Sequence, residues 1–202
     1  MARQSDSQLA RSALFNLPWL TLGIVFVQVV CFVFSSLSAT EASFFALQAI
    51  DDSQLRTWGF DLSHPLRNAG LNVLSSFFIH SGWGHFISNL SMSFLVLFLA
   101  ERSHSKRTIL LYLLLGHLLG LIGAYVAYLS LSQPTIVVGM SAGIFAVAAA
   151  VLKARFGRTA YAVSCLLAFI YSYADFAGFT AHVFAILLGL AGNTQKIRQL
   201  QS

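Results

Sequence analysis

Charged residues are scarce in this sequence. Of its 202 residues, only 9% are charged, whereas 57% are hydrophobic. An ordinary soluble domain has roughly 25% charged residues, and a soluble fold of this length could not cover its surface with so few. Lipid must therefore be the solvent for much of the chain, which excludes an ordinary soluble domain.

Cysteine and the common cofactor motifs are also scarce or missing. Cys31 and Cys165 both lie in apolar runs, so they predict neither a disulfide framework nor a metal-ligand spacing. The sequence has no GxxxxGK, HExxH or CxxC motif and no repeat of fixed period. We therefore expect no cofactor and no resident metal. The net charge of +5 comes from short basic clusters between apolar runs, which is typical of orientation-setting loops and not of a nucleic-acid-binding surface.

Six apolar runs predict six membrane-spanning helices. They cover approximately residues 13–37, 73–100, 109–131, 135–152, 160–174 and 179–191. The first run is longer than the apolar core of a secretory signal, so we interpret it as a span. The predicted fold is an all-α polytopic membrane protein with a six-helix domain at 13–194 and tails at 1–12 and 195–202.

If the six helices alternate in direction, the basic clusters of the short loops all fall on the same side of the membrane. Basic residues of both tails and of segments 101–107 and 153–158 fall on one side. The charged residues expected in the other loops are Asp51, Asp52, Arg56, Asp61, Arg67 and Asp175. The positive-inside rule then predicts cytoplasmic termini. Residues 40–72 are predicted to form a structured outer loop.

Four polar residues within the spans need an explanation, because such groups are costly in lipid. His85 and Asn89 are four residues apart, so they share one helix face. They lie near the outer start of the second span, provided that this helix enters the bilayer near Trp83. Ser141 lies early in the fourth span, and His182 lies a few residues into the sixth. All four groups are therefore expected at similar depth in the outer half of the membrane, which scattered structural residues would not require.

Small residues at spacing four form a stripe on the fourth and sixth spans. The stripes are Ala142, Ala146 and Ala150, and Ala181, Ala185 and Gly189. Such spacing lets helix backbones approach closely in lipid, although a stripe alone is more often a plain packing seam. With the matched depths, the stripes predict that Ser141 reaches His182. His117 on the third span has no obvious partner, and we interpret it as a packing residue.

Three motifs, on the second, fourth and sixth spans, resemble those of the rhomboid intramembrane serine proteases. The motifs are His80-Ser-Gly-Trp-Gly-His85-Phe-Ile-Ser-Asn89, Gly139-Met140-Ser141, and Ala181-His182 followed by Gly189. The pair Glu101-Arg102 also follows the second span as in that family. Each motif is weak alone, but their order on a six-helix topology is specific. The resemblance covers approximately residues 58–193.

The resemblance implies a serine endopeptidase that cleaves transmembrane segments of membrane proteins in the lipid bilayer. Ser141 would be the nucleophile and His182 the general base. His85, Asn89 and the backbone N–H of Ser141 would stabilise the oxyanion, and His80 would lie by the mouth of the site. A six-helix form without an added domain also looks bacterial, which implies a plasma-membrane location.

Several positions around the predicted site support it or depart from the family pattern. The site-supporting residues are His80, Gly139, Met140, Phe145 and Gly189. The departures are Ala142 for a glycine, Phe145 for a common tyrosine, Ala185 for a frequent glycine, and Leu71-Asn72 for Trp-Arg. None removes a group that handles a proton or a charge. The spans that bear the motifs contain no acidic residue, so we predict a dyad whose imidazole packs against Phe145.

The same residues leave other interpretations open. Hydrolysis would need a polar cavity, which His80, Ser81, Ser88 and Gln133 could line. An inactive rhomboid-like protein that binds membrane clients is one alternative, and a small transporter is another. A metal site of His80, His85 and His182 is possible by ligand type, although the usual acidic group is missing. The sequence does not separate a general rhomboid from a rhombosortase-like branch, and it leaves the substrate and the oligomeric state open.

Overall fold

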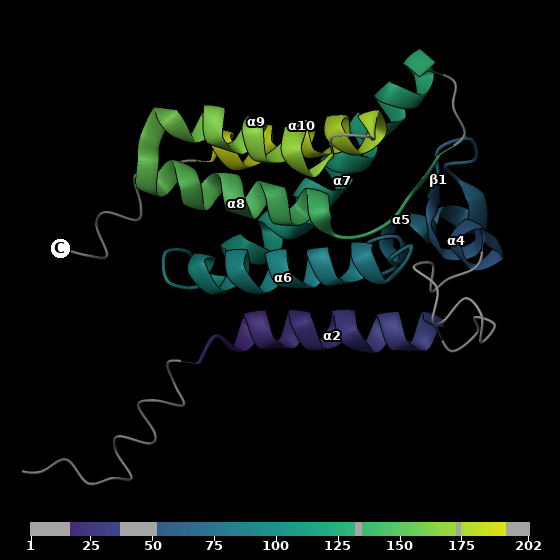
Figure 1. The fold of residues 1–202 in the computed structure, drawn as a ribbon, viewed down its shortest axis with the longest axis horizontal. Coiled ribbons are helices and arrows are strands. Elements are labelled where there is room, and N and C mark those ends of the chain that lie inside the picture. The colour runs from purple at the N-terminus through teal and green to yellow at the C-terminus, as the bar shows by residue number, and fades with distance from the viewer. Residues whose placement is uncertain (1–16, 37–51, 132–134, 173–174, 193–202) are drawn as a thin grey trace, which may run out of the picture.

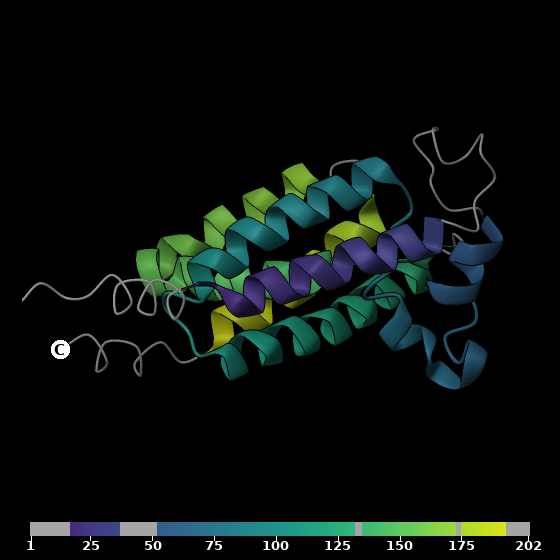
Figure 2. The same ribbon diagram turned by 90° about the horizontal axis from the view of Figure 1, so that it is seen from below.

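The computed structural model describes residues 17–36, 52–131, 135–172 and 175–192. Six long helices run side by side along the longest axis of the molecule (Figures 1 and 2). They are α2 (Trp19–Ser36), α6 (Trp83–Ala100), α7 (Lys106–Leu131), α8 (Ser141–Phe156), α9 (Ala160–Tyr171) and α10 (Phe176–Ala191). Each corresponds to one predicted span, so the predicted all-α bundle is confirmed. The two predicted tails and the segment 40–51 lie outside the described residues.

The apolar character of the helices differs with their position. Among the described residues, α2, α6 and α7 are long and apolar enough to cross a membrane, and α9 and α10 are shorter apolar helices. The surface of the outer helices carries large exposed side chains such as Phe26 and Phe34 on α2 and Leu129 on α7. Such an apolar surface is stable in lipid and not in water.

The second apolar run does not form one helix over its whole length, and its long helix begins at Trp83, the predicted point of entry into the bilayer. The run from Val73 was expected to be one helix, but α5 (Asn72–Ser75) is a single turn and α6 begins only at Trp83. Gly82, just before α6, is fully extended, and glycines and serines in this stretch disfavour a continuous helix. The fourth span also begins late, at Ser141, because Ile136–Val137 form the short strand β2.

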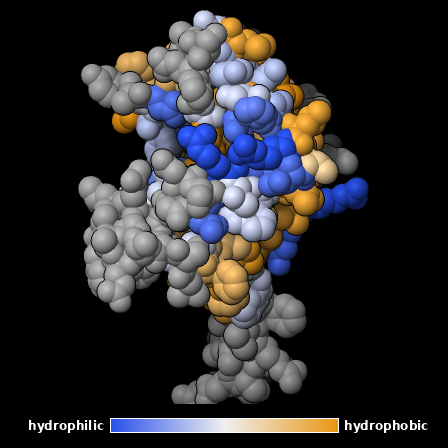
Figure 3. Space-filling view, turned by 90° about the vertical axis from the view of Figure 1, so that its right-hand side faces the viewer, coloured by the Kyte–Doolittle hydropathy of each residue, from blue (hydrophilic) through white to orange (hydrophobic). Residues whose placement is uncertain are grey.

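A small polar layer covers the end of the bundle at which α6 and α8 begin. It contains α4 (Asp52–Trp58), β1 (Phe60–Asp61), the 3₁₀ turn η1 (Arg67–Gly70) and α5. Hydrophilic side chains gather in the middle of this end, with hydrophobic ones around them (Figure 3). β1 pairs antiparallel with β2, Phe60 opposite Val137. The layer therefore holds the segment that leads into α8.

Asn72, one of the departures from the family pattern, ties this layer together. Its Nδ2 donates hydrogen bonds to the carbonyl oxygens of Thr57, at 3.0 Å, and Gly59, at 2.6 Å. The side chain is buried. The described part of the predicted outer loop is thus structured, as expected.

The core lies where α8 packs against α7 and α10. A Cβ atom on Gly189 of α10 would collide with the carbonyl oxygen of Ala146 on α8. A Cβ atom on Gly143 of α8 would collide with the carbonyl oxygen of Leu113 on α7. Ala142, Ala146 and Ala185 form one buried cluster. The close approach predicted for the fourth and sixth spans is therefore confirmed, and α7 approaches α8 in the same way.

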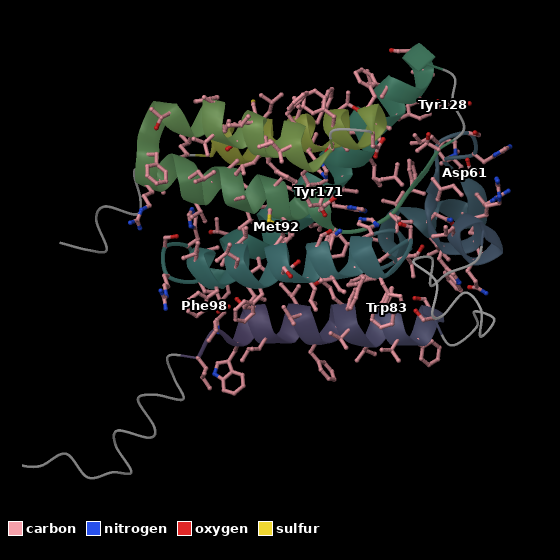
Figure 4. All side chains as sticks on the ribbon, viewed as in Figure 1. Asp61, Trp83, Met92, Phe98, Tyr128 and Tyr171 are labelled. Carbon is pink, nitrogen blue, oxygen red and sulfur yellow. The ribbon has the colours of Figure 1, made fainter. Side chains whose placement is uncertain are left out.

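α2 joins the bundle mainly through α6. The Glu101 carboxylate accepts hydrogen bonds from the backbone N–H of Thr21, at 2.7 Å, and from its hydroxyl, at 2.6 Å. Halfway along, the Gln28 amide donates to the Ser93 hydroxyl at 3.1 Å. Near the other end, the ring of Phe32 stacks on that of Phe86 with centroids 4.0 Å apart. Trp83 lies at this same contact between the two helices (Figure 4).

Candidate active site

Ser141 and His182 meet at the start of α8. Ser141 is the first residue of α8, and its Oγ lies 2.8 Å from Nε2 of His182 on α10. This distance is within normal hydrogen-bond range. His182 is 4% exposed, so its imidazole is almost fully shielded from solvent. A buried imidazole beside a serine hydroxyl is the arrangement that nucleophilic catalysis requires.

Gly139 allows the backbone to turn into α8 beside His85. Its φ of +94° lies in the left-handed region that favours glycine. A Cβ atom at this position would also lie only 2.9 Å from Nε2 of His85. The N–H of Gly139 donates to the carbonyl oxygen of Ser76 at 2.7 Å. Met140 follows, fully buried, and its sulfur contacts the Gln28 amide.

The imidazole of His182 is held from three sides. The ring of Phe145 lies 4.3 Å from it at an interplanar angle of 35°, so the contact predicted from the sequence is present. The ring of Tyr171 lies edge-on at 5.4 Å. The Ser172 hydroxyl oxygen lies 2.6 Å from Nδ1. Neither Tyr171 nor Ser172 was predicted as a site residue.

His85 and Asn89 line up beside the dyad on the first two turns of α6. Nδ2 of Asn89 donates to the carbonyl oxygen of His85 at 3.0 Å and to the Tyr171 hydroxyl at 3.1 Å. Nδ1 of His85 lies 3.1 Å from the Ser81 hydroxyl, which leaves Nε2 facing Gly139. In Figure 4, Tyr171 lies between α9 and α6, consistent with these bonds. His85 and Asn89 therefore lie close together, but the Asn89 amide already donates to two acceptors within the protein and its side chain is buried.

A model of the Rhomboid domain family matches residues 67–199, which is more than half of the chain. The chain belongs to the rhomboid family. No curated protein matches the sequence. Rhomboids are generally intramembrane serine proteases that act on transmembrane substrates. The family and the apolar helices make the chain an integral membrane protein.

A cavity of about 660 Å³ opens beside Ser141 and His182. Ser141, His182 and His85 line it, and the Asp175 side chain also reaches it. Ser81 and Ser88 line it as predicted, whereas Gln133 lies outside the described residues. Hydroxyl, imidazole and carboxylate groups on its wall make it able to hold water, which peptide hydrolysis consumes.

The prediction for His80 was wrong. His80 is fully buried and does not line the cavity, so it does not lie at the mouth of the rhomboid site. Its ring sits behind the site, 5.3 Å from the ring of His85 and 5.5 Å from that of Phe86. The backbone is extended at Gly82, and the His80 ring packs against two residues of the first turn of α6, which a continuous helix would not allow. His80 supports His85 by contact.

His117 has the partners that the sequence did not reveal. Its Nε2 lies 3.0 Å from the carbonyl oxygen of Val73 and 3.3 Å from the Ser76 hydroxyl. Its ring packs edge-on against Phe77 at 5.0 Å. His117 therefore joins α7 to the irregular segment before α6, which fits its interpretation as a packing residue.

The metal alternative gains no support from the positions of the histidines. Among the described residues, no group of three or more histidine, cysteine, aspartate or glutamate side chains comes together to hold a metal ion. His80 contacts His85 ring to ring, while His182 is directed at Ser141 and Ser172.

Proposed function

We propose that this rhomboid is an active serine endopeptidase that cleaves transmembrane segments, with Ser141 as nucleophile and His182 as general base. The observation that carries the proposal is the 2.8 Å contact between Ser141 Oγ and His182 Nε2 on the wall of a cavity that also holds polar side chains. An inactive member that only binds clients would have no need of this pair.

The reaction follows the usual path for a serine nucleophile. His182 Nε2 takes the proton of the Ser141 hydroxyl as Oγ attacks the carbonyl carbon of the scissile bond. The C–N bond then breaks, and the same proton passes from Nε2 to the leaving nitrogen. Water from the cavity attacks the acyl-enzyme by the same route and releases the second product.

The oxyanion formed during the attack needs donors that are already in place. The side chains of His85 and Asn89 and the N–H of Ser141 are the candidates. Because Ser141 is the first residue of α8, its N–H has no acceptor within the helix, and the positive end of the helix dipole also points there. Met140, Gly139 and Gly189 support this geometry through the turn into α8 and the close contact of α8 with α10.

The orientation follows from the charges. We propose that the termini are cytoplasmic, so that Lys153 and Arg155 of α8 lie at the inner face and Asp61 and Asp175 at the outer face. The site then opens to the outer side of a membrane, which we propose to be a bacterial plasma membrane.

The decisive experiment is cleavage of a reporter membrane protein by the wild type, Ser141→Ala and His182→Ala. Either substitution should lower the cleavage rate by more than about 10⁴-fold, because the nucleophile and the base act in the same step and neither works without the other. Ser164→Ala on α9 and His104→Ala at the far end of the bundle are matched controls that should cleave normally. Cleavage that persists in Ser141→Ala would refute the proposal.

Labelling by a fluorophosphonate probe separates an active protein from an inactive binder. The probe should label the wild type and leave Ser141→Ala unlabelled. Wild-type protein that binds membrane clients but reacts with no probe would identify the inactive alternative.

The substrate must expose its peptide bonds before Ser141 can attack them. A transmembrane helix hides them in its own hydrogen bonds. Segments with glycine or proline near the outer boundary should therefore be cleaved faster than a poly-leucine segment. Equal rates for the two would contradict this part of the proposal.

A further inference from the structure

Ser172 makes a contact that the proposed Ser141–His182 dyad leaves unexplained. Its hydroxyl oxygen lies 2.6 Å from Nδ1 of His182, on the side of the imidazole opposite Ser141. The residue is 7% exposed and lines the cavity beside Ser141 and His182. Nothing in the sequence motifs of the site includes it.

The backbone holds Ser172 firmly at this position. The residue caps the C-terminal end of α9, and its N–H donates to the carbonyl oxygen of Ala168 at 3.0 Å. Its own carbonyl oxygen accepts the N–H of Asp175, the residue before α10, at 2.9 Å. Hydrogen bonds to α9 and to the residue before α10 therefore fix the backbone of Ser172, whose hydroxyl faces His182.

The chemistry at Nε2 decides which tautomer the imidazole needs. To accept the Ser141 proton, Nε2 must carry a free lone pair, so the hydrogen of the neutral ring must be on Nδ1. Phe145 packs against the ring but has no polar atom, so it cannot choose between the tautomers. The Ser172 hydroxyl can accept the hydrogen bond from Nδ1–H in this tautomer and so hold the ring in the orientation that faces Ser141.

We propose that Ser172 is a positioning residue that holds His182 in its reactive orientation by accepting the hydrogen bond of Nδ1–H. The proposal rests on the proposed function of the dyad. The N–H of Nδ1 donates to Ser172 Oγ throughout the cycle. When Nε2 takes the Ser141 proton, the ring becomes an imidazolium, and Ser172 keeps accepting the bond from Nδ1. No proton moves to Ser172, whose hydroxyl stays neutral.

The test compares Ser172→Ala with Ser172→Thr and Ser164→Ala. Ser164 is a matched control because it is a buried serine of the same helix whose Oγ has no hydrogen-bond partner among the described residues. In Ser172→Ala we expect kcat to fall by about 10- to 100-fold with little change in KM, the usual effect of losing a hydrogen bond to a charged group. Threonine keeps the hydroxyl and should restore most of the rate. Ser164→Ala should match the wild type.

A second measurement reads the tautomer directly. Nitrogen-15 spectra of histidine-labelled protein, assigned with His182→Ala, should show His182 protonated on Nδ1 in the wild type and in Ser172→Thr. In Ser172→Ala the Nδ1–H signal should show the loss of its hydrogen-bond acceptor. This readout needs only folded protein, so it tests Ser172 even if the wild type cleaves nothing.

The possible results are distinct. An unchanged kcat in Ser172→Ala, a change confined to KM, or an unchanged His182 spectrum would overturn the role of Ser172. An equal loss of rate in Ser164→Ala would also overturn it, because any small disturbance of α9 would then be sufficient. A wild type with neither cleavage nor probe labelling would refute the proposed function instead.

Discussion

Helices α8 and α9 are neighbours with opposite characters. α8 has eight buried residues among 16, and its apolar part consists largely of alanines before Lys153 and Arg155. α9 is apolar, but only Ala160, Ser164 and Ala168 among its 12 residues are buried. The apolar side chains of α9, such as Leu166 and Phe169, are exposed.

The difference shows that burial in this bundle depends on small size more than on apolarity. Lipid solvates large apolar side chains as well as a protein core does, so helix packing gains most from close backbone approach. α8 carries alanines and Gly143 where it meets α7 and α10. α9 meets its neighbours through the short stripe of small residues Ala160, Ser164 and Ala168.

The largest loss of stability should come from placing a large side chain in the contact between α8 and α10. Gly189→Leu places a side chain where even a Cβ atom would collide with the Ala146 backbone. Because backbone cannot move aside as a flexible side chain can, we expect a loss of about 3 kcal/mol or more in stability. The measurement is the fraction of protein that stays folded in detergent during heating. Gly23→Leu on α2, where no atom lies within 4 Å of a built Cβ, is the control. Equal heat resistance in both variants would contradict the proposed importance of this contact.

An identical truncation on the two helices tests the comparison directly. Val147 on α8 is 1% exposed and Val163 on α9 is 40% exposed. Val147→Ala should destabilise the fold by about 2 kcal/mol, because it leaves a cavity among packed neighbours. Val163→Ala should change the free energy of unfolding by less than about 0.5 kcal/mol. Reversible unfolding in mixed detergent gives both values, and similar losses would mean that α9 is packed as tightly as α8.

A small loss of cleavage activity should follow from a change at the C-terminal end of α9. Tyr171→Phe removes the hydroxyl that contacts Asn89 and Ser88 and keeps the ring beside His182. We expect kcat to fall by about five- to tenfold, since one neutral hydrogen bond is lost. Steady-state cleavage of the reporter measures it.

A double variant sharpens this prediction. If Tyr171 acts by holding Asn89, then Tyr171→Phe should have little further effect in an Asn89→Ala background. Additive losses would show that the Tyr171 hydroxyl acts elsewhere.

The sequence was sufficient for the parts of the fold that depend on composition and spacing. Six apolar runs gave the six helices, and small residues at spacing four gave the contact of α8 with α10. The positions of Ser141 and His182 within their runs gave the meeting of these two side chains. Each of these features follows from helical geometry and from the cost of polar groups in lipid.

The rest depends on irregular backbone, for which the sequence has no simple period. The segment 76–82 folds His80 behind the site, and the pairing of β1 with β2 shortens the fourth span. Ser172 was missed because it lies at the end of a span that carries no motif. Its position next to Tyr171 and just before a tight turn was the available signal, but hydroxyl residues are common at helix ends.

The bond between Glu101 and Thr21 has a consequence for biosynthesis. The two residues are separated by 80 positions in the chain. A ribosome makes α2 long before it reaches Glu101, so the N-terminal end of α2 enters the membrane without the carboxylate that later satisfies it. Only when α6 has followed can the first helix acquire its permanent partner, and α2 and α6 therefore complete their assembly as a pair.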